Sequence, residues 1–318
     1  MRFLILALAL AAAVPGHAQS YPSRPVRVVV GFTPGGGVDI NARLLAAKLS
    51  ELLGQQFVVE NKPGAGTNIG NEFVAKSAAD GYTLLFTSPA VAINMSLYRN
   101  PPYDALRDFA GVSVFSESTN LLVVPAALPA QSVKDLVAMA KEKSGTLNYS
   151  SAGQGTTQHL AGELFKLRAG VDLLFIPYKG NGPALTDLLG GQLDTAFNTV
   201  AITLPLVQSG KLRALAVAGE RRSRLAPDVP TMIDAGLPGF AFSGWYGIVA
   251  PARTPDAIVK RLNQALVQIM KTPDIVERMA AMGNEPVGNT PAEFDRFIRD
   301  EIPKWGKVIR DAKISLAP

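Results

Sequence analysis

Short apolar runs alternate along the chain with segments whose apolar residues recur at helical spacing, a pattern typical of an α/β fold. The run Val26–Val30 predicts a buried parallel strand, and residues 40–53 predict the helix that follows it. The same alternation predicts further strands at residues 57–60, 82–87, 109–115, 120–125, 147–150, 173–176, 194–198, 212–217 and 242–250. Because the strand and helix pattern restarts near residue 147, we expect two domains.

The connection between the first strand and its helix, residues 31–39, contains three successive glycines, Gly35 to Gly37. Glycine leaves backbone N–H groups unobstructed and permits positive φ, and a helix start adds unpaired N–H groups and the positive end of the helix dipole. A second small-residue connection, residues 150–157, follows the strand that opens the second domain. The two turns predict anion-binding sites that can face each other. The alternative for the first turn is a glycine-rich connection that binds nothing.

The tail predicts three helices, each opened by a Thr-Pro pair in which the threonine is the N-cap. They cover residues 255–271, 273–282 and 291–312, with Thr254, Thr272 and Thr290 as the N-caps. We expect these helices to pack on the first domain, and the strands at residues 120–124 and 242–250 to cross between the domains. The predicted first domain comprises residues 19–122 and 244–318, and the predicted second domain comprises residues 123–243.

Residues 1–18 read as a secretory signal peptide that is cleaved after Ala18. Arg2 precedes an apolar stretch, residues 3–14, that is too short to span a bilayer. The chain contains no cysteine, so it forms no disulfides and carries no lipid on a cysteine side chain. The net charge of +5 is spread over interspersed charges of both signs. We therefore expect an exported, soluble monomer that does not bind nucleic acid.

The sequence shows no set of residues that an enzyme of this size would use. His159 is the only histidine outside the signal segment, and it is expected to have a structural role beside the second turn. Residues 64–70 come close to a dinucleotide fingerprint, but the last glycine falls one residue late. We expect no metal, no cofactor and no catalytic residue. The alternative is a secreted hydrolase or lyase that uses His159 with Asp39 or Glu163.

Several segments, in this order along the chain, resemble the Bug family of periplasmic receptors for tripartite tricarboxylate transporters. They are residues 21–26, 31–39, 59–66, 79–84 and 176–180. The resemblance implies a type II-like periplasmic binding protein, in which two α/β domains joined by two crossing strands close over a small carboxylate. It also implies a periplasmic location and a membrane transporter as partner. A receptor that signals to a membrane sensor is a further alternative.

Carried over by position, the family's ligand site falls on the two turns and on strand ends. The implied ligand-binding residues are Phe32, Gly36, Gly37, Val38, Asp39, Ser88, Ala90, Ser151, Gly155, Thr156, Thr157, Tyr178 and Asn198. In the family the position of Asn198 often carries an aspartate, which would favour an ammonium group on the ligand. Since Asn198 lacks that charge, the resemblance leaves the ligand open among di- and tricarboxylates, aromatic carboxylates and related acids.

Overall fold

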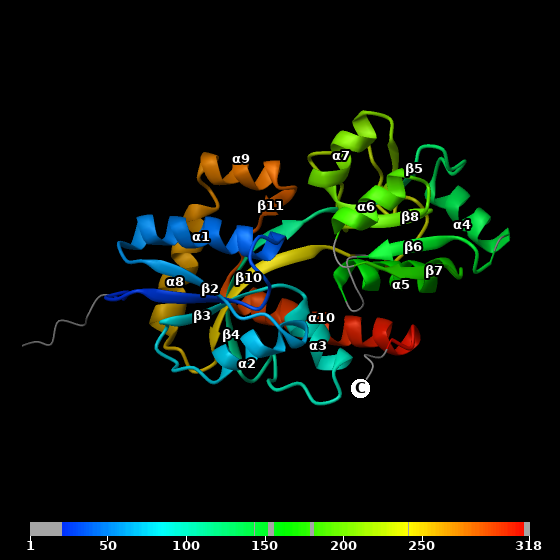
Figure 1. Ribbon diagram of the computed structural model, residues 1–318. Coiled ribbons are helices and arrows are strands. Elements are labelled where there is room, and N and C mark those ends of the chain that lie inside the picture. The colour runs from blue at the N-terminus through cyan, green and yellow to red at the C-terminus, as the bar shows by residue number, and fades with distance from the viewer. Residues whose placement is uncertain (1–20, 143, 152–155, 179–180, 241, 315–318) are drawn as a thin grey trace, which may run out of the picture.

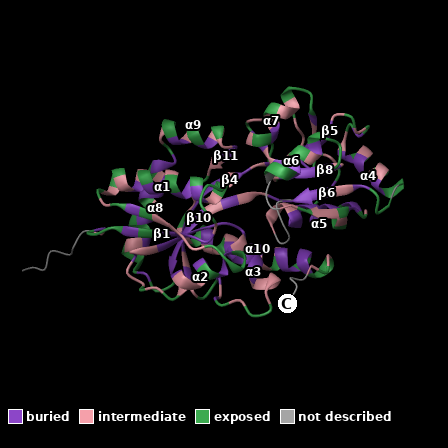
Figure 2. Ribbon diagram, in the orientation of Figure 1, coloured by how far each residue is buried: buried purple, intermediate pink, exposed green. Residues whose placement is uncertain are grey.

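The computed structural model describes residues 21–142, 144–151, 156–178, 181–240 and 242–314. The predicted signal peptide and cleavage site lie outside these residues. Within them the chain forms two lobes, each built on one sheet with helices on its faces (Figure 1). The strands are mostly buried, and the exposed residues lie on the outer faces of the helices (Figure 2). The predicted two-domain α/β fold is confirmed, and its residue bounds remain a prediction.

The sheet of the first lobe has six strands in the order β11-β4-β10-β3-β1-β2. The strands are β1 (Val26–Val30), β2 (Phe57–Asn61), β3 (Thr83–Thr87), β4 (Phe109–Ser118), β10 (Gly244–Pro251) and β11 (Asn284–Pro286). Strand β1 pairs in parallel with β2 and β3, whereas β10 is antiparallel to β3 and β4. Val28 and Val29 contribute to different hydrophobic clusters, so β1 is covered on both faces and is apolar along most of its length.

Helices from both ends of the chain cover this sheet. They are α1 (Gly37–Leu53), α2 (Asn68–Ala75), α3 (Ala90–Leu97), α8 (Asp256–Ile269), α9 (Pro273–Ala281) and α10 (Pro291–Asp311), with the 3-10 turn η1 (Ala65–Thr67) before α2. Leu45 of α1 and Leu262 of α8 pack with Val28, and Val74 of α2 and Phe294 of α10 pack with Val29.

The sheet of the second lobe has five strands in the order β7-β6-β8-β5-β9. The strands are β5 (Asn120–Pro125), β6 (Asn148–Ser151), β7 (Leu174–Pro177), β8 (Thr195–Thr199) and β9 (Leu212–Val217). The helices are α4 (Val133–Glu142), α5 (Thr157–Ala169), α6 (Asn181–Leu189) and α7 (Val200–Gln208). Strand β6 is parallel to β7 and β8, so the carboxyl ends of these strands meet at the edge that faces the first lobe (Figure 1).

The chain crosses between the lobes twice. Strand β4 continues through Thr119 into β5, and residues 218–243 lead from β9 back to β10. Thr119 also ties the crossing to its surroundings, because its N–H donates to Gly283 and its carbonyl accepts from Val200. The sequence pattern did not predict α3, α7 or β11.

Two expectations for the tail are corrected by the structure. Thr254 is not an N-cap, because α8 begins at Asp256 with Pro255 in the capping position. Thr290 does cap α10, and with Glu293 it forms a capping box. The tail helices also do not pack on the first lobe alone: Trp305, in the last turns of α10, packs into the core of the second lobe. Among the described residues, no helix combines the length and apolar character needed to cross a membrane.

Candidate functional site

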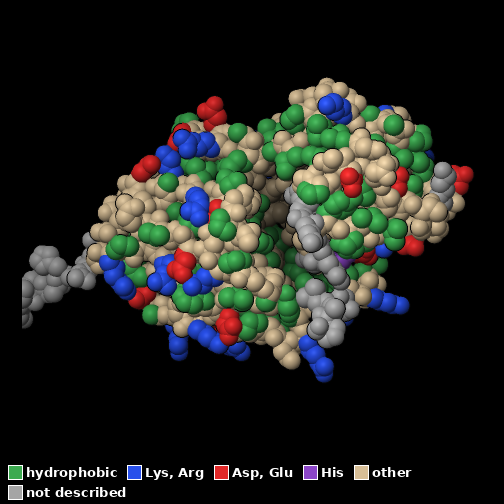
Figure 3. All heavy atoms as spheres, in the orientation of Figure 1, with side chains coloured by type: hydrophobic (Ala, Val, Ile, Leu, Met, Phe, Trp, Pro, Cys, Tyr) green, Lys and Arg blue, Asp and Glu red, His purple; other side chains and the backbone are tan. Residues whose placement is uncertain are grey.

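A cleft of about 890 Å³ lies between the two lobes (Figure 3). The first lobe contributes the segment after β1, the 3-10 turn η1 with the residues before it, and the turn between β3 and α3. The second lobe contributes the starts of α5 and α7. The floor comes from the crossing strands, where Ser118, Asn120, Gly244 and Tyr246 line the cleft. Ligands of open α/β sheets bind beyond the carboxyl ends of the strands, and the cleft occupies this position in both lobes.

Helices from both lobes point their N-terminal ends at the cleft. At α1, α3 and α7 the capping residue makes no side-chain hydrogen bond to the first turn. At α5 the Thr156 hydroxyl accepts from the His159 N–H at 3.4 Å. Uncapped first turns keep N–H groups that have no intrahelical partner, and the helix dipole makes the same region positive. On both sides of the cleft, therefore, oriented N–H groups are available as hydrogen-bond donors to an anion.

No Lys, Arg, Asp or Glu lines the cleft in the part of the chain that the structure describes. The lining consists of backbone, hydroxyl and amide groups together with apolar side chains such as Ile40, Ile93 and Ile202. Among these described lining residues, an anion would find no charged side chain with which to form an ion pair. The helix N-termini supply the positive potential at this site, because their N–H groups and the helix dipole are held in place by the fold.

Asp39 anchors the first turn from behind. Its carboxylate accepts from the Gly35 N–H at 2.9 Å, from Arg43 Nε at 3.0 Å and from Asn61 Nδ2 at 2.8 Å. The hydrogen bond from Arg43, assisted by the other two donors, lowers the pKa of Asp39 to about 2. Asp39 is 3% exposed and is not part of the described lining, so its carboxylate shapes the turn.

The three glycines of this turn differ in their surroundings. Gly35 alone among them has a positive φ, 83°, and Gly36 is the N-cap with an extended backbone. A Cβ on Gly37 would lie 3.1 Å from Tyr246 Oη, so Gly37 is required by a close approach and not by its φ. A Cβ on Gly36 would have only the Thr33 carbonyl near it, at 3.9 Å.

The predicted ligand-binding residues separate into three groups. Those that line the cleft are Phe32, Gly37, Val38, Ser88, Ala90, Thr156 and Thr157. Those that the structure places outside the described lining are Gly36, Asp39, Ser151, Tyr178 and Asn198. Gly155 lies outside the described residues, and ligand contact itself remains a prediction for all of them.

Local structure explains why Tyr178 and Asn198 lie away from the cleft. The Tyr178 hydroxyl donates to Asp187 at 2.6 Å, which directs the ring toward α6. Asn198 sits on β8 opposite Leu121 and is 4% exposed, so it faces the interior of the second lobe. A contact between Asn198 and the ligand stays a prediction, and so does the effect of Asn in place of Asp on the choice of ligand.

The sequence did not indicate several lining residues, among them Tyr98, Asn120, Tyr246 and Met282. Tyr246 lies in a strand pattern and Tyr98 follows a helix that the pattern did not predict, so neither carries a motif. Only the pairing of β10 with β3 and β4 brings Tyr246 under the first turn of α1.

Within the described residues, His159, Glu163 and Asp39 do not come together as a catalytic set. The imidazole is 4% exposed and stacks on Phe175 with ring centroids 4.0 Å apart. Burial lowers the pKa of His159, which favours the neutral ring. Glu163 accepts a hydrogen bond from the Tyr149 hydroxyl at 2.6 Å and pairs with Lys166, while Asp39 lies in the other lobe.

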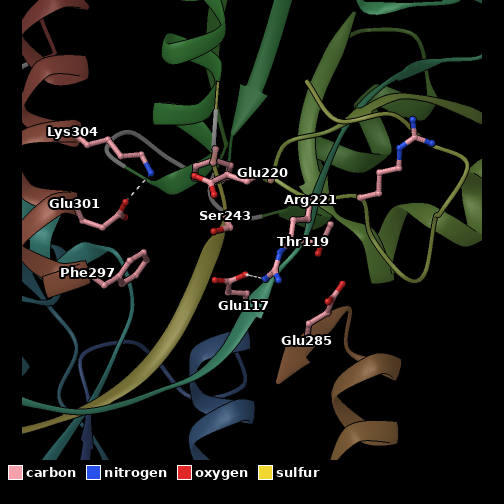
Figure 4. Close-up of a pocket in the computed structure, with 12 residues that line it drawn as sticks. Glu117, Thr119, Glu220, Arg221, Ser243, Glu285, Phe297, Glu301 and Lys304 are labelled. Carbon is pink, nitrogen blue, oxygen red and sulfur yellow. Dashed lines mark hydrogen bonds and ion pairs between the residues drawn. The ribbon is translucent and has the colours of Figure 1, made fainter. Parts of the chain in front are cut away.

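A second cavity, of about 190 Å³, lies on the other face of the crossing strands (Figure 4). Side chains alternate along a strand, so Ser118 and Asn120 face the cleft whereas Glu117 and Thr119 face this cavity. Arg221 reaches Glu117 at 3.8 Å, and Lys304 pairs with Glu301 at 2.7 Å (Figure 4). The described residues contain no cluster of His, Cys, Asp and Glu that could hold a metal ion.

The fold and the cleft define a two-domain α/β solute-binding protein of the periplasmic type. The sequence profile described as "Tripartite tricarboxylate transporter family receptor" matches residues 41–314, and the chain belongs to this family. Protein BugT of Bordetella pertussis is 40% identical over 306 residues, which cover 96% of this chain and 94% of BugT.

Solved structures of related proteins have the same fold. "R. palustris Rpa4515 with adipate" is 38% identical, with a TM-score of 0.81 over 93% of this chain and 99% of that chain. "MatC (Rpa3494) from Rhodopseudomonas palustris with bound malate" is 31% identical, with a TM-score of 0.77 over 91% of this chain and 100% of that chain. The family consists of substrate-binding receptors and not of enzymes, so the hydrolase or lyase alternative is set aside.

Proposed function

We propose that the protein captures a small carboxylate in the cleft between its lobes. The observation that carries this proposal is a cleft without charged side chains among its described lining residues, bordered by helix N-termini from both lobes. A cation would meet the positive ends of these helices and find no carboxylate partner, whereas a carboxylate would receive N–H and hydroxyl donors from both sides. The bound adipate and malate of the two related structures support this ligand class.

We further propose that the protein works in the periplasm as a monomer and delivers its ligand to a membrane transporter of the tripartite tricarboxylate type. Family membership supports this partner. Deletion of the gene should abolish uptake of the carboxylate that the purified protein binds. Uptake that continues at the wild-type rate would instead favour a receptor that signals to a membrane sensor.

Ligand binding is tested by calorimetry on the purified protein with adipate, malate, citrate and benzoate. Adipamide serves as the neutral control for adipate, because it keeps the length of the chain but lacks the charges. At least one carboxylate should bind with micromolar affinity or better, and adipamide should bind far more weakly than adipate. Equal binding of adipate and adipamide, or no binding of any acid, would contradict the proposal.

A further inference from the structure

Tyr246 lies in the floor of the cleft, on the crossing strand β10. The register between β10 and β4 shifts between Tyr246 and Gly247, which marks a β-bulge or an irregularity. Such irregularities re-aim side chains and recur beside functional sites. The ring stacks on Phe86, with centroids 6.2 Å apart and planes inclined by 21°. One face of the ring is therefore fixed by the core of the first lobe, and the hydroxyl is presented to the cleft.

The Tyr246 hydroxyl lies beside the first turn of α1. A Cβ built on Gly37, the first residue of that helix, would be 3.1 Å from Tyr246 Oη. The N-cap, Gly36, has no side chain that could accept from the first N–H groups of α1. These backbone donors and the phenol therefore lie side by side at the cleft. Ser88 adds a second hydroxyl to the lining; it is 6% exposed and makes no side-chain hydrogen bond within the described residues.

The hydroxyl groups of the seven tyrosines distinguish structural residues from those that face the cleft. Five of the hydroxyls form hydrogen bonds with other groups of the protein, those of Tyr21, Tyr82, Tyr103, Tyr149 and Tyr178. Tyr98 and Tyr246 both line the cleft, and their hydroxyls have no hydrogen-bond partner in the described part of the chain. A tyrosine that only filled space could be a phenylalanine, since a buried hydroxyl without a partner is unfavourable.

We propose that Tyr246 is a ligand-binding residue that donates a hydrogen bond from its hydroxyl to a carboxylate held at the N-terminus of α1. The inference rests on the proposed function and adds to it a side-chain donor. Burial raises the pKa of the Tyr246 phenol, so the group stays protonated at neutral pH and acts as a donor. In a cleft whose described lining has no cation, this donor would account for a large share of the preference for a carboxylate.

The test compares Tyr246→Phe with Tyr82→Phe in the full mature protein. Tyr246→Phe removes the hydroxyl and keeps the ring, whereas Tyr82→Phe removes a hydroxyl that bonds Ser23 away from the cleft. The probe is whichever of adipate, malate, citrate and benzoate the wild type binds most tightly. Calorimetry should show affinity about 10- to 150-fold weaker for Tyr246→Phe, the range for one hydrogen bond to a charged group, and unchanged affinity for Tyr82→Phe.

Two outcomes separate this inference from the proposed function. If the wild type binds a carboxylate and Tyr246→Phe binds it equally well, the inference is wrong and the proposed function stands. If the wild type binds none of the four acids, the proposed function fails and the inference fails with it.

A second readout excludes an indirect effect of the substitution. In protein labelled with 3-fluorotyrosine, the ¹⁹F resonance that is missing from Tyr246→Phe belongs to Tyr246. It should shift when the probe acid is added and shift less with the neutral amide of the same acid. A resonance that does not move at saturation would overturn a direct contact.

Discussion

At the scale of single residues, the glycine turn before α1 has three positions with different requirements. We expect Gly35→Ala to reduce the free energy of unfolding by about 1–2 kcal/mol, because its φ of 83° is unfavourable for a residue with a Cβ. Gly36→Ala should leave both stability and binding unchanged, since a Cβ there meets nothing closer than 3.9 Å. Gly37→Val should abolish carboxylate binding in a folded protein, because its side chain would displace the Tyr246 hydroxyl and occupy the approach to α1.

Urea denaturation and calorimetry on the three variants measure these two properties separately. Normal binding by folded Gly37→Val would contradict the role assigned to the turn. Loss of binding in Gly36→Ala would show that the turn does not tolerate a Cβ at this position, and would contradict the prediction made from the open space around Gly36.

The sequence located this turn but not the role of each residue in it. Three glycines between a strand and a helix are a local signal, and the turn was predicted from them. The path of the backbone decides that only Gly35 needs a positive φ. Gly37 must lack a side chain because Tyr246 approaches it, and Tyr246 lies on a strand more than 200 residues away. Asp39 was also predicted at the site, but Arg43 and Asn61 hold its carboxylate behind the turn.

His159 is expected to make stability depend on pH. Burial lowers the pKa of His159 below its usual value of 6.5, so the folded state binds its proton less readily than the unfolded state. The stabilising contribution is complete above pH 6.5 and is lost as the pH falls through the range between the unfolded and folded pKa values. Glu163 opposes this shift and Lys166 adds to it.

When the pH is lowered from 7.5 to 5.5, the urea midpoint should therefore decrease more for the wild type than for His159→Gln. Carboxylate binding at pH 7.5 should change by less than about tenfold in His159→Gln, the value of one ordinary hydrogen bond. An identical pH dependence of both proteins would contradict the burial of a neutral histidine.

At the scale of elements, α10 links the two lobes. Phe294 and Ile298 in its first half pack under the sheet of the first lobe, and Trp305, Val308 and Ile309 in its second half pack in the core of the second lobe. Pro303 lies between these halves, where a helix loses one backbone hydrogen bond and bends more easily. The helical period of residues 291–312 predicted the helix, but the period cannot show that one apolar stripe serves two cores.

Glu301 joins the two halves of α10 to the crossing strand. Its carboxylate accepts from Trp305 Nε1 at 2.7 Å and from Trp245 Nε1 at 3.4 Å, and Lys304 pairs with it. The chain has two tryptophans, so both indoles share this buried carboxylate. We expect Glu301→Gln to lower the free energy of unfolding by about 1.5–3 kcal/mol, the range for hydrogen bonds to a charged group, and to change the tryptophan emission.

Glu285→Gln is the matched control for this variant. Glu285 also lies at the cavity behind the crossing strands, but its partner Arg224 is exposed and 4.0 Å away. Its loss should reduce stability by no more than about 1 kcal/mol and leave the emission unchanged. Equal effects of the two substitutions would contradict the assigned role of Glu301.

At the scale of the whole molecule, the arrangement of the lobes predicts closure on the ligand. A carboxylate-bearing ligand that contacts the starts of α1 and α5 together gains more donors in a closed cleft than in an open one, and this difference in affinity shifts the population toward closure. We expect the two crossings, at Thr119 and at residues 218–240, to act as the hinge. Because the end of α10 packs with the second lobe, we expect the rotation to be accommodated near Pro303.

Small-angle X-ray scattering with and without a saturating carboxylate measures this movement. The radius of gyration of the wild type should decrease when the ligand is added, because the two lobes approach each other and water leaves the cleft. Gly37→Val, which should not bind, is the control and should give the same profile under both conditions. If the wild type binds the acid by calorimetry but its profile does not change, the cleft is a rigid pocket, and the packing of Trp305 against the second lobe then holds the lobes in one arrangement.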